Sequence, residues 1–140
     1  MGNDVEYKDN LEGITADMLQ EFFVGWRREV SAQEHLELLA GSYKIWLALD
    51  EGRVVGFVHA ISDGVLAAFI PLLEVLPKWH GRGIGKELMR RILEDLEGMY
   101  MVDACCDDDK VGFYEQFGMV KHGNAMLKRS YGIAAKSVPQ

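Results

Sequence analysis

The sequence has no long hydrophobic run and only two cysteines. No apolar stretch approaches the roughly 20 residues that a membrane-spanning helix needs, and the N-terminus has no signal-peptide pattern. Cys105 and Cys106 are adjacent, and disulfide geometry is hard to reach at that spacing. We therefore expect a cytoplasmic protein in a reducing compartment that does not associate with membranes.

The sequence also lacks zinc-ligand spacings and an excess of positive charge. Its two cysteines and four histidines are scattered, so no metal is expected. The 15 basic and 22 acidic residues give a net charge of −7, which argues against general nucleic-acid binding. Residues 78–91 are an exception, with five basic residues and one acidic residue. This basic cluster suits a multiply phosphorylated ligand, whereas the acidic remainder would attract a cationic co-substrate or only confer solubility.

The hydrophobic pattern predicts one α/β domain with a mixed sheet over residues 1–130, followed by a tail over residues 131–140. Strands are expected at residues 5–8, 43–49, 53–61, 66–76 and 99–105, with one or two more within 120–129. Helices are expected near residues 14–22, from the capping box at 31–34 to residue 40, and at 84–97 and 111–117. The order is β-α-α-β-β-β-α-β-α-β, with a right-handed βαβ unit over residues 66–105.

The segment Pro77-Lys-Trp-His-Gly-Arg-Gly-Ile-Gly-Lys86 joins the expected strand at 66–76 to the expected helix at 84–97. The start of a helix presents unpaired backbone N–H groups and the positive end of the helix dipole, which suit a phosphate group. Gly81, Gly83 and Gly85 would let the backbone approach a bulky anion closely. The segment therefore predicts a phosphate-binding turn.

Two common phosphate motifs do not match this turn. A P-loop needs a glycine where the sequence has His80 and a serine or threonine where it has Glu87. A Rossmann fingerprint needs a glycine where the sequence has Lys86.

The turn resembles the pyrophosphate loop of the GCN5-related N-acetyltransferase family, whose pattern is Gln/Arg-x-x-Gly-x-Gly/Ala. Here it reads His80-Gly81-Arg82-Gly83-Ile84-Gly85, with histidine at the first position. The Val75-x-Pro77 lead-in and the segment Phe113-Tyr114-x-x-x-Gly118 strengthen the resemblance, and the element order matches across nearly the whole chain. The resemblance implies the family's acyl-CoA N-acyltransferase fold, in which two central parallel strands splay apart.

The resemblance also implies acetyl-CoA as co-substrate. Its pantetheine arm would lie between the splayed strands, where Pro77 and a local bulge would end the pairing. The N–H of Val75 would polarise the thioester carbonyl. The side chains here could equally be core, because the backbone does the binding. The implied cofactor-binding residues are Leu73, Val75, His80, Gly81, Arg82, Gly83, Ile84, Gly85 and Lys86.

The implied reaction is attack of a primary amine of a small molecule or protein on the acetyl thioester, through a tetrahedral intermediate. Tyr114 matches the family's tyrosine and would protonate the leaving thiolate, because a phenol with a pKa near 10 is protonated at pH 7. The structural alternative is an aromatic core residue beside Phe117.

The sequence does not identify a single general base. Glu74 is the only ionisable residue in the apolar run 66–76, and it is either a functional carboxylate or a structurally paired one. His59 on the preceding strand is a second candidate, although a lone strand histidine is more often structural. A chain of water molecules could also remove the proton.

The acceptor pocket would be built from residues 22–30 and from the strand at 53–61, which carries His59. Phe23 and Trp26 could form an aromatic wall for an alkylammonium group by cation–π contact. They could equally be a hydrophobic staple between two helices.

An acetyl-CoA-dependent N-acetyltransferase is thus the leading hypothesis. A non-catalytic acyl-CoA-binding or sensing module of the same fold is the alternative, because no base is obvious. A protein-interaction domain that forms a homodimer through exposed strand edges is a third.

Overall fold

The computed structural model of the protein describes residues 4–129. The chain divides into two compact units, Met1–Ala104 and Cys105–Gln140. One domain over residues 1–130 stays a prediction, and the expected tail at 131–140 lies outside the described residues. Within residues 4–129, no helix is long and apolar enough to cross a membrane, and no group of three or more His, Cys, Asp or Glu could hold a metal ion.

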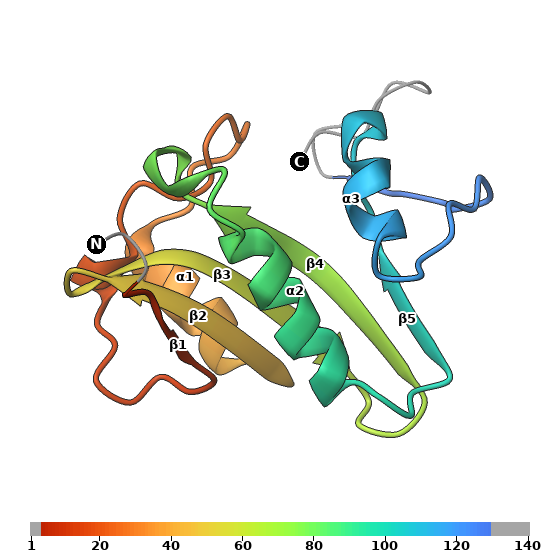
Figure 1. The fold of residues 1–140 in the computed structure, drawn as a ribbon, viewed down its shortest axis with the longest axis horizontal. Helices are drawn as coiled ribbons and strands as arrows, with labels where there is room; N and C mark the ends of the chain where they lie inside the picture. The colour runs from red at the N-terminus through yellow and green to blue at the C-terminus, as the bar shows by residue number, and fades with distance from the viewer. Residues whose placement is uncertain (1–3, 130–140) are drawn as a thin grey trace. The chain divides into compact units, whose positions relative to one another are not determined.

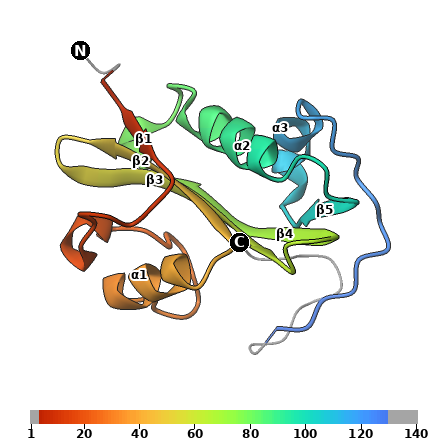
Figure 2. The same ribbon diagram turned by 90° about the horizontal axis from the view of Figure 1, so that it is seen from below.

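The first unit is a five-stranded sheet with helices on both faces. The strands are β1 (Glu6–Lys8), β2 (Lys44–Asp50), β3 (Arg53–Ser62), β4 (Ala67–Val75) and β5 (Met101–Ala104), and they lie in chain order. β1 to β4 are antiparallel to their neighbours, whereas β4 and β5 are parallel, as Figure 1 shows. The 3-10 turn η1 (Ala16–Leu19) and helix α1 (Ala32–Ala40) lie on one face and α2 (Ile84–Asp95) on the other (Figure 2). The predicted mixed α/β sheet is confirmed.

Local sequence signals set most of these boundaries. α1 begins at the predicted capping box, where the Ser31 hydroxyl accepts from the N–H of Glu34 at 3.0 Å and the Glu34 carboxylate accepts from the N–H of Ser31 at 3.0 Å. α2 begins after Gly83, and its apolar stripe of Ile84, Leu88, Met89 and Ile92 is buried. These signals act between residues close in sequence, which is why they could be read in advance.

Two predicted elements are wrong or reduced. The helix expected near residues 14–22 is only η1, because Gln20 is extended and Glu21 and Phe23 adopt left-handed backbone angles. In the second unit, η3 (Asp108–Lys110) and α3 (Val111–Glu115) are present, but residues 120–129 form no strand. That segment contains Gly123-Asn124, and its apolar Val120 and Met126 are 86% and 93% exposed, so it has no buried face to pair.

The core beneath η1 and α1 combines aliphatic and aromatic side chains with two buried histidines. His35 is fully buried, and its ring lies 4.3 Å from that of Phe57 and 4.9 Å from that of Phe23. His59 is 4% exposed. The apolar members of this core are Ile14, Leu19, Phe23, Leu39, Ile45, Leu47, Val54 and Phe57.

Gly56 on β3 allows α2 to approach the sheet closely. A Cβ at this position would lie 3.2 Å from Leu88 Cδ1, 3.3 Å from Ile84 Cγ2 and 3.3 Å from Val75 Cγ2. The start of α2 and the end of β4 therefore meet over a glycine, which helps to position the turn between them.

We expect Gly56→Val to destabilise the protein by about 1–3 kcal/mol, because the added methyl groups overpack this contact. Urea denaturation measures the change. Gly123→Val is the matched control, since a Cβ there would meet nothing within 4 Å. Equal stability of the two variants would contradict the close-approach interpretation.

Candidate active site

The parallel pairing of β4 with β5 ends halfway along β4. It runs from Ala67 opposite Met101 to Ile70 opposite Ala104. The second half of β4, residues 71–75, has β3 on one side and no partner strand on the other in the described sheet. The edge of β4 is therefore open where the sequence predicts that pantetheine binds.

A β-bulge lies at the point where this pairing ends. Phe69 faces Ile61 and Leu72 faces His59, so two residues of β4, Ile70 and Pro71, occupy the space of one residue of β3. The expected bulge is therefore present. The proline that lies at the end of the pairing is Pro71, whereas Pro77 begins the 3-10 turn η2 (Pro77–Trp79) after the strand. A proline within an apolar strand is itself a signal for a bulge or an edge, so the sequence does carry a signal for this position of Pro71.

The bulge also changes which edge the backbone donors face. The N–H of Leu76 donates to the carbonyl of Val55 at 2.9 Å, toward β3. Because N–H groups alternate along a strand, those of Leu73 and Val75 point to the opposite, open edge. These are the two donors that the resemblance assigns to acyl-CoA.

The glycine turn that follows has open space around it. Gly81 and Gly83 have φ values of 78° and 80°, and a Cβ at either would meet nothing within 4 Å. Gly83 is the N-cap of α2, with no side chain capping the helix. The N–H of Glu87 donates to Gly83 O at 3.0 Å, so the first-turn N–H groups of Ile84, Gly85 and Lys86 precede the first helical bond. They are available to an anion.

The side chain of His80 is engaged elsewhere. Its Nε2 lies 2.6 Å from the carbonyl oxygen of Val75, so it links the turn to the end of β4. A cofactor-binding role for His80 stays a prediction.

The basic cluster is only partly free. Arg90 and Arg91 contact the Glu87 carboxylate at 2.7 and 2.6 Å, and hydrogen bonds from Arg90 and then Arg91 lower the pKa of Glu87 to about 2. Lys78, Arg82 and Lys86 are exposed and make no ion pair within residues 4–129. Three cations thus remain near the turn.

Glu74 holds a loop on the α1 face of the sheet. Its Oε1 and Oε2 accept from the N–H of Phe23 at 2.9 and 3.1 Å, and Oε2 also lies 3.4 Å from the N–H of Val24. Burial raises the pKa of Glu74, and the hydrogen bonds from Phe23 and Val24 act in the opposite direction. Glu74 therefore has the structural pairing that was one of its two predicted roles.

His59 is in the core rather than at an open surface. Its Nδ1 lies 2.8 Å from the Ser42 hydroxyl, and burial lowers its pKa to about 4. A buried imidazole that is so hard to protonate is a weak base for an alkylammonium with a pKa near 10.4. This position favours the structural alternative for His59.

The two aromatic residues expected in the acceptor pocket differ in exposure. Phe23 is 8% exposed and is a core residue. Trp26 is 37% exposed, and its ring lies 5.1 Å from that of Phe23. Only Trp26 of this pair presents a ring to solvent.

Tyr114 belongs to the second unit, so its surroundings are those of that unit. It is half-buried on α3, and its ring lies 5.1 Å from that of Phe113. Burial is the larger cause, and the charge of a Cys106 thiolate the smaller one, that together raise the pKa of Tyr114 to about 12. The phenol therefore keeps its proton at neutral pH, as a proton donor must.

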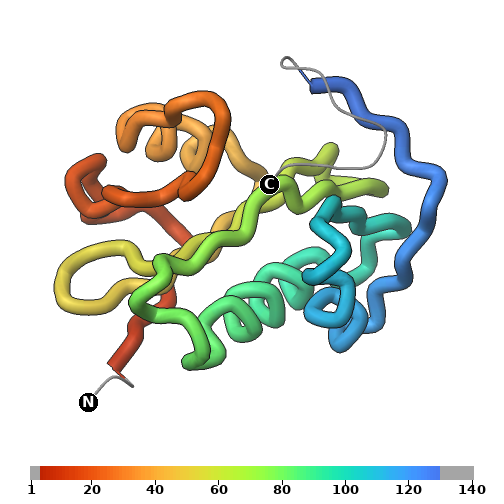
Figure 3. The backbone as a smooth tube through the Cα atoms, turned by 90° about the horizontal axis from the view of Figure 1, so that it is seen from above, coloured from red at the N-terminus to blue at the C-terminus, as the bar shows by residue number. Residues whose placement is uncertain are grey.

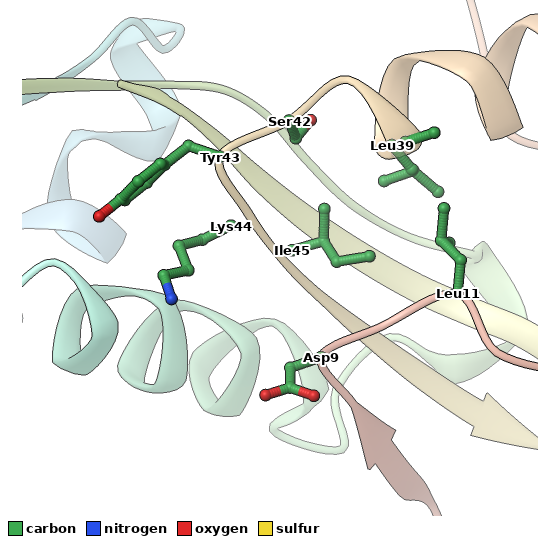
Figure 4. Close-up of a pocket in the computed structure, with 8 residues that line it drawn as sticks. Asp9, Leu11, Leu39, Ser42, Tyr43, Lys44 and Ile45 are labelled. Carbon is green, nitrogen blue, oxygen red and sulfur yellow. The ribbon is translucent and has the colours of Figure 1, made fainter. Parts of the chain in front are cut away.

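A pocket on the first unit lies at the start of β2, as Figure 4 shows. None of the predicted cofactor, catalytic or acceptor residues lines it. Its lining residues are Asp9, Leu11, Leu39, Ala40, Ser42, Tyr43, Lys44 and Ile45.

Comparison with known proteins agrees with this geometry. Residues 11–119 match the model of the acetyltransferase (GNAT) family. The chain is 32% identical to GCN5-related N-acetyltransferase 1, chloroplastic, of Arabidopsis thaliana over 78% of this chain and 58% of that protein. It is 31% identical to serotonin N-acetyltransferase 2, chloroplastic, of Oryza sativa subsp. japonica over 81% of this chain and 60% of that protein. The chain thus spans less than two thirds of the length of these curated relatives.

A solved structure from Deinococcus radiodurans R1, provisionally described as an acetyltransferase, has the same fold. It is 46% identical to this chain, with a TM-score of 0.87 over 95% of this chain and 96% of that one. The fold and the family predicted from the sequence are confirmed. The chain belongs to the acetyltransferase (GNAT) family.

Proposed function

We propose that the protein transfers an acetyl group from acetyl-CoA to a primary amine of a small molecule or protein. The observation that carries this proposal is the open edge of β4, where the N–H groups of Leu73 and Val75 point away from β3. The chain then continues to the start of α2, which no side chain caps. Family membership and relatives named as N-acetyltransferases support the reaction class.

The residues of the first unit fit an acyl-CoA. The N–H groups of Leu73 and Val75 would hold the pantetheine arm and the thioester oxygen, because a strand edge offers evenly spaced donors. The first turn of α2 would bind the pyrophosphate, with Arg82 and Lys86 nearby. The bound thioester supplies the acetyl group, and the chain positions it and donates to the oxygen that becomes negative.

Coenzyme A release over a panel of amines, followed with a thiol reagent, tests the proposal. We expect turnover with at least one amine. Polyamines, lysine peptides and aryl-alkylamines belong in the panel. Aryl-alkylamines are included because one relative is named for serotonin and because Trp26 presents an exposed aromatic ring. Absence of turnover with every amine would contradict the proposal.

A non-catalytic acyl-CoA-binding module is the second candidate. It is favoured by one observation, namely that Glu74 is bonded to the loop and His59 is buried, so neither is an obvious free base. Saturable binding of coenzyme A in calorimetry without turnover of any amine would favour it. A thermal shift on addition of coenzyme A separates both candidates from a protein-interaction domain. The expected homodimer and cytoplasmic location stay predictions.

We expect Tyr114→Phe to lower turnover by about 10–100-fold with little change in the affinity for acetyl-CoA, because the variant loses the proton for the leaving thiolate. The thiolate is already a tolerable leaving group, which keeps the loss modest. Steady-state kinetics of coenzyme A release measure it. Phe117→Tyr, on the same segment, is the control. Unchanged turnover in Tyr114→Phe would remove this residue from the mechanism.

A further inference from the structure

Two consecutive backbone N–H groups converge on one carboxylate in the first unit. The N–H of Phe23 lies 2.9 and 3.1 Å from the two oxygens of Glu74, and that of Val24 lies 3.4 Å from Oε2. Glu74 is 51 residues away from Phe23 in sequence. These bonds therefore tie the loop between η1 and α1, residues 20–30, to β4. Figure 3 shows this loop in orange, between η1 and α1.

The loop needs such an anchor because its backbone is strained. Glu21 and Phe23 have φ values of 73° and 66°. The left-handed region is unfavourable for a non-glycine residue, and such residues persist only where surrounding contacts hold them. Arg53 is a second anchor, since its guanidinium donates to the carbonyl of Gln20 at 2.7 Å and contacts Glu21 at 3.0 Å.

The anchored backbone sets the position of the exposed tryptophan. Phe23 is fixed by Glu74 at its N–H and by the core at its ring. The N–H of Trp26 donates to the carbonyl of Phe23 at 3.2 Å, and the two rings lie 5.1 Å apart. The contacts thus run from Glu74 to Phe23 and on to Trp26.

The position of Glu74 on β4 links these contacts to the proposed binding site for the acyl donor. Glu74 lies between Leu73 and Val75, whose N–H groups point to the open edge. Its carboxylate, by contrast, reaches the loop on the α1 face. Residues 73–75 of β4 therefore carry the N–H groups proposed to bind the acyl donor and also the carboxylate that bonds to the loop. The N–H groups of the loop also occupy lone pairs of the carboxylate that a base would need.

We propose that Glu74 is a positioning residue that holds residues 20–26, with Trp26, as a wall of the acceptor-amine site. This inference rests on the proposed acetyltransferase function. Glu74 acts through the loop, and the proton of the amine leaves by another route.

Two substitutions at Glu74 separate positioning from base catalysis. Glu74→Gln keeps an acceptor oxygen of the same reach but cannot take a proton. We expect it to retain kcat within about 5-fold, with an unchanged pH profile, whereas Glu74→Ala should lower kcat/KM for the amine about 10–100-fold, mainly through KM. The KM for acetyl-CoA should stay within about 3-fold in both, because the backbone of Leu73 and Val75 is retained. Equal losses of about 100-fold or more in kcat for both variants would show a general base and overturn the proposal.

Hydrogen exchange gives a readout that does not depend on catalysis. The amides of Phe23 and Val24 should exchange at least about 10-fold faster in Glu74→Ala than in the wild type, because their acceptor is gone. Glu97→Ala is the matched control, since Glu97 is an exposed carboxylate elsewhere in the first unit. If no amine is acetylated, faster exchange still shows the anchor, and the fault then lies with the proposed function. Unchanged exchange in Glu74→Ala would refute the anchor itself.

Discussion

Replacing Gly83 with glutamate should weaken the binding of coenzyme A by about 100-fold or more, roughly 2.7 kcal/mol of binding free energy. Gly83 is the N-cap of α2, where the helix offers unpaired N–H groups and the positive end of its dipole. A glutamate there would bring a negative charge to the place proposed for the pyrophosphate. It would also force a side chain onto a residue with a φ of 80°.

Three variants separate charge from strain and from general destabilisation. Gly83→Ala adds only the left-handed strain, about 1–2 kcal/mol, so its loss of affinity should be smaller. Gly98→Glu is the matched control for the larger change. Gly98 follows the other end of α2, has a φ of 96°, and has nothing within 4 Å of its Cβ position. Titration calorimetry measures the affinities. Retained binding in Gly83→Glu would mean that the glycine turn is only structural.

Lowering the pH from 7.5 to 5 should cost the protein on the order of 4 kcal/mol of folding stability, about 2 kcal/mol from each of His35 and His59. Burial lowers the pKa of both residues to about 4, and for His35 the charge of a protonated His59 adds to the effect. Both nitrogens of His35 and Nε2 of His59 have no hydrogen-bond partner in the described residues. The folded protein therefore favours the neutral form of both rings over the protonated form.

The direction of the effect follows from the two states. An unfolded histidine takes a proton near pH 6.5, whereas the folded ones do so only near pH 4. The stability contributed by the neutral rings is thus fully present above pH 6.5, falls as the pH drops toward 4, and changes no further below that. Loss of negative charge from an acidic protein acts in the opposite direction over this range, so a variant is needed to isolate the histidines.

His35→Leu provides that variant, because the ring lies among Phe22, Phe23 and Phe57 and an apolar side chain suits this site. Urea denaturation at pH 7.5, 6 and 5 should show the difference between pH 7.5 and 5 reduced by about half. His122→Gln, which replaces an exposed histidine, is the control. The same pH dependence in His35→Leu and the wild type would contradict the buried neutral ring.

Much of the fold could be predicted because its signals are local. The mostly apolar run at 53–61 and the stripe of Ile84, Leu88 and Ile92 each depend on neighbours within a few residues. The left-handed angles of Gly81 and Gly83 follow from the same cause, since glycine alone adopts them at little cost. Where local signals were weak, as at residues 120–129, the predicted strands did not appear.

The site residues show where local reasoning stops. The sequence marked Glu74 as unusual, because it is the one ionisable residue in an apolar run, but its role could not be chosen. The structure shows its partners, the N–H groups of Phe23 and Val24, which come from a loop on another element. Likewise the sequence placed His59 on a strand, and only the packing of α1 against the sheet shows that it is buried.

The amino-acid sequence by itself determined the family, the glycine turn at the start of α2 and the strands that flank it, because these depend on residue type at fixed short spacings. Only the tertiary structure located the bulge at Ile70 and Pro71, gave the register that turns the N–H groups of Leu73 and Val75 to the open edge, and showed the bond between Glu74 and the loop. Those features depend on the register of one strand against the next and on contacts between residues far apart in the chain. No short stretch of sequence specifies such contacts.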